Sequence, residues 1–255
     1  MEFQIKIANR IIGITSLYDE AYRLCEGYYV EGNGITVVED ASAESEAFHV
    51  TITQPDINFE REKSIREAIA EGLPVQDYPD SYLETLAVYR QIALGMLAYD
   101  TYLMHGAVIG VGDKAFLFTA HSGVGKTTHI KLWLENIPGA YIINGDKPLL
   151  RYCDGGFEVC GTPWAGKEGM QKNTIVPLKA VCLLERGEAN SIERISFMDC
   201  YSVLLQQSYR PSDPEKMQKT MELVSLLGKA VPLYRLKCNM EAEAAEVAYA
   251  GMTKV

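Results

Sequence analysis

The residues best suited to chemistry run from position 120 to position 128, with the sequence Ala-His-Ser-Gly-Val-Gly-Lys-Thr-Thr. Its two glycines allow a tight backbone turn that points N–H groups at phosphate oxygens. Lys126 supplies a compact positive charge for the β- and γ-phosphates, and the Thr127 hydroxyl suits a Mg²⁺ ion bound to the same phosphates. The pattern predicts these nucleotide-binding residues: Ser122, Gly123, Val124, Gly125, Lys126, Thr127 and Thr128.

The sequence around this stretch supplies the structural context that a phosphate-binding loop requires. Residues 115–119 form an apolar run typical of a buried strand. After the loop, apolar residues fall at helical spacing on one face, at Ile130, Trp133, Leu134 and Ile137. Ala120 stands where the usual pattern has its first glycine, so a plain glycine-rich turn between strand and helix is the alternative interpretation.

A second candidate follows the next predicted strand, residues 140–143. Asp146 comes shortly after that strand, where a carboxylate can hold Mg²⁺ or accept a proton from an incoming hydroxyl. The alternative is a structural turn, because Asn144-Gly145 is a strong turn pair. His105 lies on a strand predicted over residues 102–111, next to the strand that leads into the loop. It could lie near the phosphates or serve only the sheet.

A later loop, residues 161–167, combines Gly, Pro, Trp and Lys in the sequence Gly-Thr-Pro-Trp-Ala-Gly-Lys. This composition suits a substrate or phosphate contact, and it suits a plain surface loop equally well. Lys147, Lys167 and Lys172 could add positive charge near a triphosphate or could be solvated surface residues.

Composition limits the classes of function. The chain has 255 residues and a net charge of −10, which argues against nucleic acid as a partner because phosphate backbones demand clustered Lys and Arg. No apolar run reaches membrane-spanning length, and the first residues lack the features of a signal peptide, so we expect a cytoplasmic protein without a membrane partner. The six cysteines lack metal-site spacing and are expected to be free thiols, mostly in the core.

The length is sufficient for one large domain with a smaller lobe. We place a small N-terminal α/β lobe at residues 1–80 and a nucleotide-binding domain at residues 81–255. The helical pattern over residues 81–99 is assigned to the second domain.

Three short motifs together resemble the HPr kinase/phosphorylase family. They are Met104-His105-Gly106, residues 122–127 and Gly145-Asp146-Lys147, in that order and at similar spacing. The resemblance extends more distantly to ATP-dependent phosphoenolpyruvate carboxykinases. Uncharacterised HPr-kinase-related proteins look closer still, with a loop like residues 161–167. The family resemblance is strongest over residues 100–186, and it covers neither end of the chain.

The resemblance implies an α/β fold with a P-loop core and a mixed sheet, to which the sequence pattern adds the small N-terminal lobe. It also implies ATP and Mg²⁺ as cofactors, with Asp146, His105 and Lys126 as catalytic residues and with Thr127 and Asp146 as metal ligands. Kinases of this family carry two adjacent aspartates after the loop helix, and here Gly145 stands in place of the first. The family's signature for recognising HPr is not identifiable, nor are the additional residues of carboxykinases.

We therefore expect an ATP-dependent kinase that transfers the γ-phosphate to a hydroxyl of a protein or a small molecule. The alternative is a nucleotide-binding sensor, an assembly protein or an ATPase that transfers no phosphate, and Gly145 favours this alternative. A homo-oligomer is compatible with either function.

Overall fold

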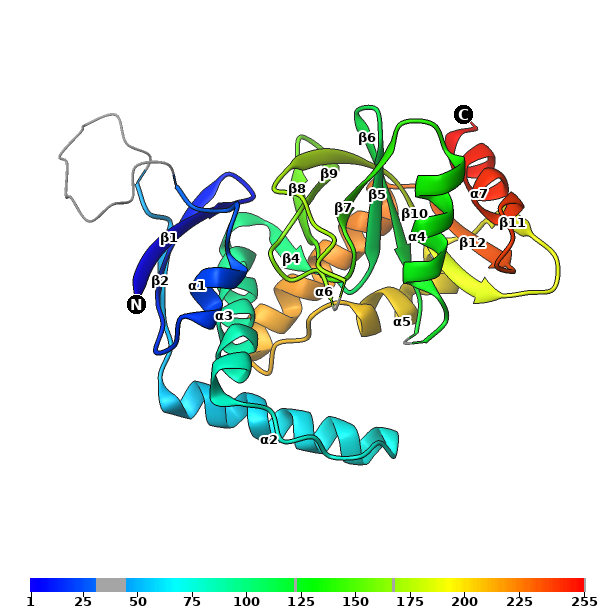
Figure 1. Ribbon diagram of the computed structural model, residues 1–255. Coiled ribbons are helices and arrows are strands. Elements are labelled where there is room, and N and C mark those ends of the chain that lie inside the picture. Colours follow the sequence, from blue (N-terminus) through cyan, green and yellow to red (C-terminus); the bar gives the residue numbers. More distant parts are fainter. Residues whose placement is uncertain (31–44, 122, 167, 255) are drawn as a thin grey trace. The chain divides into compact units, whose positions relative to one another are not determined.

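The computed structural model describes residues 1–30, 45–121, 123–166 and 168–254. The described chain forms two compact units, Met1–Gly95 and Met96–Val255 (Figure 1). Each unit has its own sheet, so this is a mixed α/β protein with a small N-terminal sheet and a larger second sheet.

The first unit is built on a three-stranded sheet. Strands β1 and β2 pair antiparallel through a short turn, and β3 pairs parallel to β2. Apolar side chains alternate along β1, which gives the sheet one buried face. The elements of this unit are β1 Glu2–Ile7, β2 Arg10–Thr15, α1 Glu20–Leu24, β3 Phe48–Thr51, α2 Gln54–Glu71 and α3 Asp80–Met96.

Helix α3 belongs with this small sheet, which differs from the predicted domain boundary after residue 80. The buried Glu84 carboxylate accepts a hydrogen bond from the backbone N–H of Tyr18 at 2.9 Å. Gly95 lies so close to Phe48 that a Cβ atom there would be 2.5 Å from its ring. An apolar helical stripe indicates that a helix is buried but does not identify the sheet that covers it, and these contacts assign α3 to the first unit.

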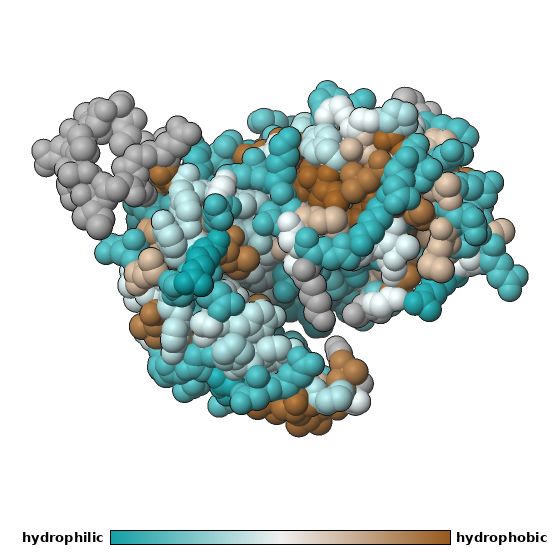
Figure 2. All heavy atoms as spheres, in the orientation of Figure 1, coloured by the Kyte–Doolittle hydropathy of each residue, from teal (hydrophilic) through white to brown (hydrophobic). Residues whose placement is uncertain are grey.

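The second half of α2 is largely exposed. Ile69, Leu73 and Val75, at the end of this helix and just beyond it, are all more than half exposed. Figure 2 shows apolar surface gathered over the lower end of α2. Ile57 and Glu60, in the first half of the helix, are buried and anchor it to its unit.

The second unit contains a nine-stranded mixed sheet. Its strands run in the order β4-β8-β9-β10-β6-β5-β7, and β12 and β11 continue from β10. Strand β10 is parallel to β6 and β12, whereas the other pairs are antiparallel. The strands are β4 Thr101–Leu103, β5 Ala107–Val111, β6 Lys114–Thr119, β7 Ala140–Asn144, β8 Leu149–Cys153, β9 Gly156–Cys160, β10 Ile175–Arg186, β11 Ser191–Arg194 and β12 Leu233–Cys238.

Strand β10 is long enough to pair with different strands along its two parts, and the sheet curls there. Its first residues, Ile175–Pro177, pair with β9, and its later residues pair with β6 and β12. A register shift between Leu178 and Ala180 separates the two parts. The mixed sheet expected from the sequence is therefore present in this unit.

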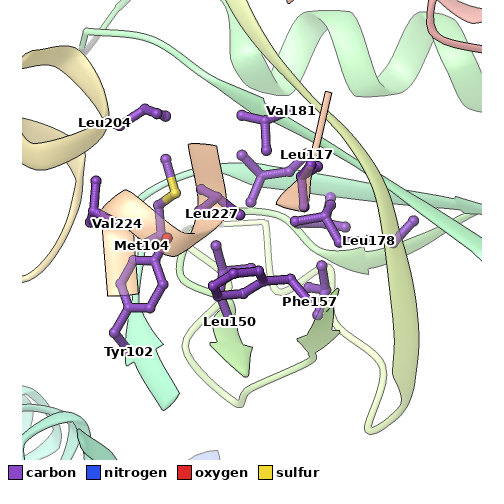
Figure 3. Close-up of a cluster of buried hydrophobic side chains, with 14 of the residues drawn as sticks. Tyr102, Met104, Leu117, Leu150, Phe157, Leu178, Val181, Leu204, Val224 and Leu227 are labelled. Atoms are coloured by element: carbon purple, nitrogen blue, oxygen red, sulfur yellow. The ribbon is translucent and has the colours of Figure 1, made fainter. Parts of the chain in front are cut away.

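Helices cover both faces of this sheet. They are the short 3-10 helix η1 Leu97–Tyr99, α4 Lys126–Asn136, α5 Phe197–Gln207, α6 Pro214–Ala230 and α7 Glu243–Thr253. Leu117 of β6 packs with Leu204 of α5 and Leu227 of α6 on one face (Figure 3). Phe116 and Phe118, which neighbour Leu117 in the strand, point to the opposite face and pack against α4 and α7.

Two further observations concern the described helices and the cysteines. Within the described part of the chain, no helix has the length and apolar character that crossing a membrane requires. All six cysteines are free thiols, and four of them are buried.

Trp133 fixes α4 to the sheet and thereby positions the start of that helix. Its indole is fully buried, with ring centroids 5.3 Å from Phe116 and 5.2 Å from Phe118. Leu134, which the helical spacing placed on the same face, is 40% exposed instead.

We expect Trp133→Ala to lower the free energy of unfolding by about 3–5 kcal/mol, because it leaves a large cavity under α4. Leu134→Ala in the same helix is the matched control and should cost about 1 kcal/mol or less, since its side chain is partly exposed. Urea denaturation of the three proteins measures both effects. Equal losses for the two variants would show that Trp133 does not anchor the helix.

Candidate functional site

The described part of the predicted phosphate-binding stretch forms a loop between β6 and α4, which we call the glycine loop (residues 120–121 and 123–125). Gly123 has φ +77° and Gly125 has φ +120°, values that L side chains rarely adopt. Ala120 is buried and has no positive φ, so this position does not need a glycine. The strand–loop–helix arrangement is confirmed, and phosphate binding by the loop stays a prediction.

Lys126 begins α4 and reaches back across the glycine loop. Its Nζ atom donates a hydrogen bond to the carbonyl oxygen of Ala120 at 3.0 Å. Burial lowers the pKa of Lys126, and the nearby charge of Asp146 opposes that shift without cancelling it. The ammonium is therefore half-buried, next to the loop and within the electrostatic field of Asp146.

His105 and Asp146 are in direct contact, as only the family resemblance had suggested. Nε2 of His105 lies 3.0 Å from Oδ1 of Asp146. An ionised carboxylate can only accept hydrogen bonds, so Nε2 carries a proton and is the donor in this contact. Histidine thus holds one carboxylate oxygen, while Nζ of Lys147 lies 3.9 Å from the other.

The backbone around His105 is fixed on several sides. The N–H of His105 donates to the carbonyl oxygen of Gln207 at 2.7 Å, and the buried Thr119 hydroxyl donates to the carbonyl oxygen of His105 at 2.9 Å. The N–H of Gly106 donates to the carbonyl oxygen of Asp146 at 2.8 Å. The sequence predicted one strand over residues 102–111, but β4 and β5 are separate and His105 lies in their connection.

Asp146 is mostly buried but stays ionised. Burial raises its pKa, but the hydrogen bond from His105 and the charges of Lys147, His105 and Lys126 outweigh burial and hold the pKa below its usual value. A carboxylate in this state can accept a hydrogen bond from a hydroxyl or bind a cation. The sequence-predicted candidates Lys126, His105 and Asp146 therefore form one electrostatic cluster.

Asn144 stabilises the turn in which Asp146 lies. The sequence offers this Asn-Gly turn as an alternative to a functional role for Asp146. The Asn144 side chain is fully buried, and its Oδ1 accepts hydrogen bonds from the N–H groups of Asp146 at 3.0 Å and Lys147 at 2.7 Å. Its Nδ2 donates to the backbone oxygen of Thr162 at 3.0 Å, and the Thr162 hydroxyl donates to the carbonyl oxygen of Lys147 at 2.8 Å. The structural turn and the placement of Asp146 therefore depend on the same hydrogen bonds.

Residues 161–166 and 168–171, which we together call the covering loop, lie over Gly145. The N–H of Gly145 donates to the carbonyl oxygen of Met170 at 2.9 Å. A Cβ atom at position 145 would lie 3.0 Å from the carbonyl oxygen of Ala165 and 3.4 Å from that of Met170. A side chain at position 145 would therefore be in tight contact with backbone, and the Ala165 carbonyl would have to shift by a few tenths of an ångström.

A cavity of about 330 Å³ lies where these elements meet. It combines two candidate residues with part of the covering loop, and its lining consists of Thr127, Gly145, Asp146, Ala165, Gly166, Glu168 and Met170. Glu168 also forms an ion pair with Lys131 of α4, with an N–O distance of 2.7 Å. The cavity is at the small end of the range for ligand sites, which begins at about 300 Å³.

The remaining residues that the sequence singled out differ in where the structure places them. Thr128 is exposed on α4, and Val124 packs against the apolar cluster under that helix. Nζ of Lys172 lies 5.1 Å from the centroid of the Tyr141 ring, a cation–π contact. Ser122 and Lys167 lie outside the described residues.

Arg186, at the end of β10, contacts the glycine loop and was not among the candidates. Its Nη2 donates to the carbonyl oxygen of Gly123 at 2.7 Å. Arg186 is distant from the loop in sequence and belongs to no motif, so no sequence signal identifies it. Glu168 was missed for the same reason.

Oxygen donors at the site fit a hard cation such as Mg²⁺, which prefers hydroxyl, carboxylate and phosphate oxygens. Thr127 and Asp146 both line the cavity and supply a hydroxyl and a carboxylate. Over the described residues, no group of three or more His, Cys, Asp or Glu could hold a metal ion by itself. A cation here would need phosphate or water oxygens to complete its coordination.

Solved structures with a likeness to this chain include a kinase/phosphatase. The chain is similar in structure to the Hpr(Ser) kinase/phosphatase from Coxiella burnetii, with a TM-score of 0.35 and 9% sequence identity over 60% of this chain and 99% of that one. No protein-family model matches the chain, and neither does any curated protein. A likeness at this level assigns no activity.

We expect Asn144→Ala to lower the free energy of unfolding by about 2 kcal/mol or more, because it leaves the N–H groups of Asp146 and Lys147 without their acceptor. Asn136→Ala is the control, since Asn136 makes a single hydrogen bond to Leu132 of its own helix. Thermal and urea unfolding measure the difference. A loss for Asn144→Ala no larger than that of the control would mean that the turn does not depend on this side chain.

We expect both Gly145→Ala and Gly145→Asp to cost about 1–3 kcal/mol of stability, because the new Cβ atom would press on the carbonyl oxygen of Ala165. Gly156→Ala is the matched control: a Cβ there would meet its nearest neighbour at 3.9 Å, and its φ is not positive. Urea denaturation compares the three variants. A Gly145→Asp protein as stable as the wild type would show that a second carboxylate fits here after all.

Proposed function

We propose that this chain is an ATP-binding, Mg²⁺-dependent phosphotransferase that passes the γ-phosphate to a hydroxyl of a protein or small-molecule acceptor. The observation that carries the proposal is the 3.0 Å contact between His105 and the Asp146 carboxylate, which lines the cavity beside Thr127 and lies in the electrostatic field of Lys126. Phosphoryl transfer needs mainly positioned charges of this kind.

The glycine loop and the start of α4 would bind the triphosphate. Backbone N–H groups of the loop and the positive end of the helix dipole favour an anion at this place. In the free protein Lys126 donates to the carbonyl oxygen of Ala120. When nucleotide binds, the ammonium would exchange that bond for charge-assisted bonds to β- and γ-phosphate oxygens.

Thr127 and Asp146 would hold Mg²⁺ together with phosphate oxygens, as their donor chemistry allows. When bound, the ion supplies positive charge that offsets the negative charge of the transferred phosphoryl group.

Asp146 would orient the acceptor hydroxyl and take its proton. The new bond forms between the hydroxyl oxygen and the γ-phosphorus, the bond from the γ-phosphorus to ADP breaks, and the proton moves to the carboxylate. His105 would keep the carboxylate in place through its bond to Oδ1. The lowered pKa of Asp146 keeps it ready to accept a hydrogen bond but makes it a weak base, so orientation is its larger contribution.

A second candidate function is nucleotide binding without phosphotransfer, as a sensor, an assembly protein or an ATPase. Gly145 favours it, because a second carboxylate at this position would bring its Cβ atom to 3.0 Å from the Ala165 carbonyl oxygen. The two functions make the same prediction for nucleotide binding and opposite predictions for a labelled acceptor.

The test incubates the purified protein with Mg²⁺, γ-labelled ATP and a cell lysate separated into protein and small-molecule fractions. We expect label in one fraction. Lys126→Ala should weaken ATP binding or abolish transfer, and Asp146→Asn should keep ATP binding but lose transfer by about 100-fold or more, the typical contribution of a positioned base.

Two exposed residues at the opposite end of β6 provide controls. Asp113→Asn and Lys114→Ala remove the same charges away from the glycine loop and should transfer phosphate like the wild type. If Lys126→Ala and Asp146→Asn also matched the wild type, the assignment of the site would be wrong. ATP binding with only free phosphate as product would favour the second candidate function.

A further inference from the structure

The end of β10 lies at the same sheet edge as the glycine loop. Strands β6 and β10 are parallel, with Thr119 of β6 opposite Leu183 of β10. The glycine loop follows Thr119, and Arg186 is the last residue of β10. In open α/β sheets ligands bind at the carboxyl ends of parallel strands, so Arg186 reaches the edge where an anion is expected.

Arg186 contacts the backbone of the glycine loop at two successive residues. Its Nη2 donates to the carbonyl oxygen of Gly123 at 2.7 Å, and its Nε donates to the carbonyl oxygen of Val124 at 3.4 Å. A guanidinium offers donors in a rigid planar fork, which suits two neighbouring acceptors. The contact therefore fixes two consecutive peptide groups of the loop.

Fixing these carbonyl groups also fixes the N–H groups joined to them. A trans peptide is planar, so its N–H points opposite to its carbonyl oxygen. The N–H of Val124 donates to the carbonyl oxygen of His121 at 3.4 Å, which closes a turn within the loop. The next N–H, that of Gly125, points away from the guanidinium because the carbonyl oxygen of Val124 points toward it.

We propose that Arg186 is a positioning residue that holds the glycine loop in its anion-binding conformation and so raises affinity for the phosphates of a nucleoside triphosphate. The proposal rests on the proposed function, and it names a residue outside the phosphate-binding motif. Arg186 contacts the backbone of the loop and would not touch the phosphates, whereas Lys126 would bind them directly. A lysine at position 186 would keep the charge but lose the fork.

The test compares Arg186→Gln and Arg186→Lys with the wild type, using Mg²⁺-ATP as the ligand in calorimetric titration. We expect both variants to raise the Kd for Mg²⁺-ATP about 10-fold or more. Neither glutamine nor lysine has the planar guanidinium whose donors reach both carbonyl oxygens. In steady-state transfer, the KM for ATP should rise in the same proportion while kcat stays within about threefold of the wild type, since the reacting groups are untouched.

Hydrogen exchange measures the positioning effect itself. Amides of residues 123–126 should exchange faster in nucleotide-free Arg186→Gln than in the wild type. Arg194→Gln, at the exposed end of β11, is the matched control and should change neither binding nor exchange. Thermal melting verifies folding, and if Arg186→Gln fails to fold, Arg186→Lys provides the binding and exchange comparison.

Three outcomes would overturn the inference. Arg186→Gln could bind ATP as the wild type does, the exchange of the loop could be unchanged, or Arg186→Lys could restore full affinity, which would assign the effect to charge alone. Wild-type protein that binds ATP but transfers no phosphate would reject the proposed function and leave the role of Arg186 standing. Wild-type protein that does not bind ATP would reject both.

Discussion

The contact between His105 and Asp146 is the interaction on which the candidate site depends. It joins the β4–β5 connection to the turn after β7, and these segments also share a backbone hydrogen bond from Gly106 to Asp146. Without the imidazole and its cationic neighbours, burial would push the carboxylate toward its protonated form. The ionised state of Asp146 is therefore a property of the fold around it.

The turn that presents Asp146 also packs tightly around Gly145. Asn144 ties the turn to Thr162, and the same covering loop brings the Ala165 carbonyl over Gly145. A Cβ atom at position 145 would have to displace this carbonyl by a few tenths of an ångström. The glycine is thus part of a tightly packed turn, in which Asp146 is the carboxylate that His105 supports.

Much of this site could be predicted from the sequence, because its central parts are local. The strand, the glycine loop and the helix are contiguous, and Asp146 follows its strand within a few residues. The contacts made by Arg186, Thr162 and Glu168 could not be predicted, since each joins segments that are distant in sequence and leave no periodic pattern. The break between β4 and β5 was missed for a related reason: apolar residues stand on both sides of His105 and Gly106, and hydropathy does not show where strand pairing changes.

The most direct test of the central claim is a crystal structure of the protein grown with Mg²⁺ and a non-hydrolysable ATP analogue. We expect the β- and γ-phosphates along residues 121–127, the Lys126 ammonium moved from the Ala120 carbonyl to a phosphate oxygen, and the metal ion between Thr127 and Asp146. The His105–Asp146 contact should persist. An analogue bound elsewhere, or a metal ion that neither residue contacts, would contradict the assignment of this site.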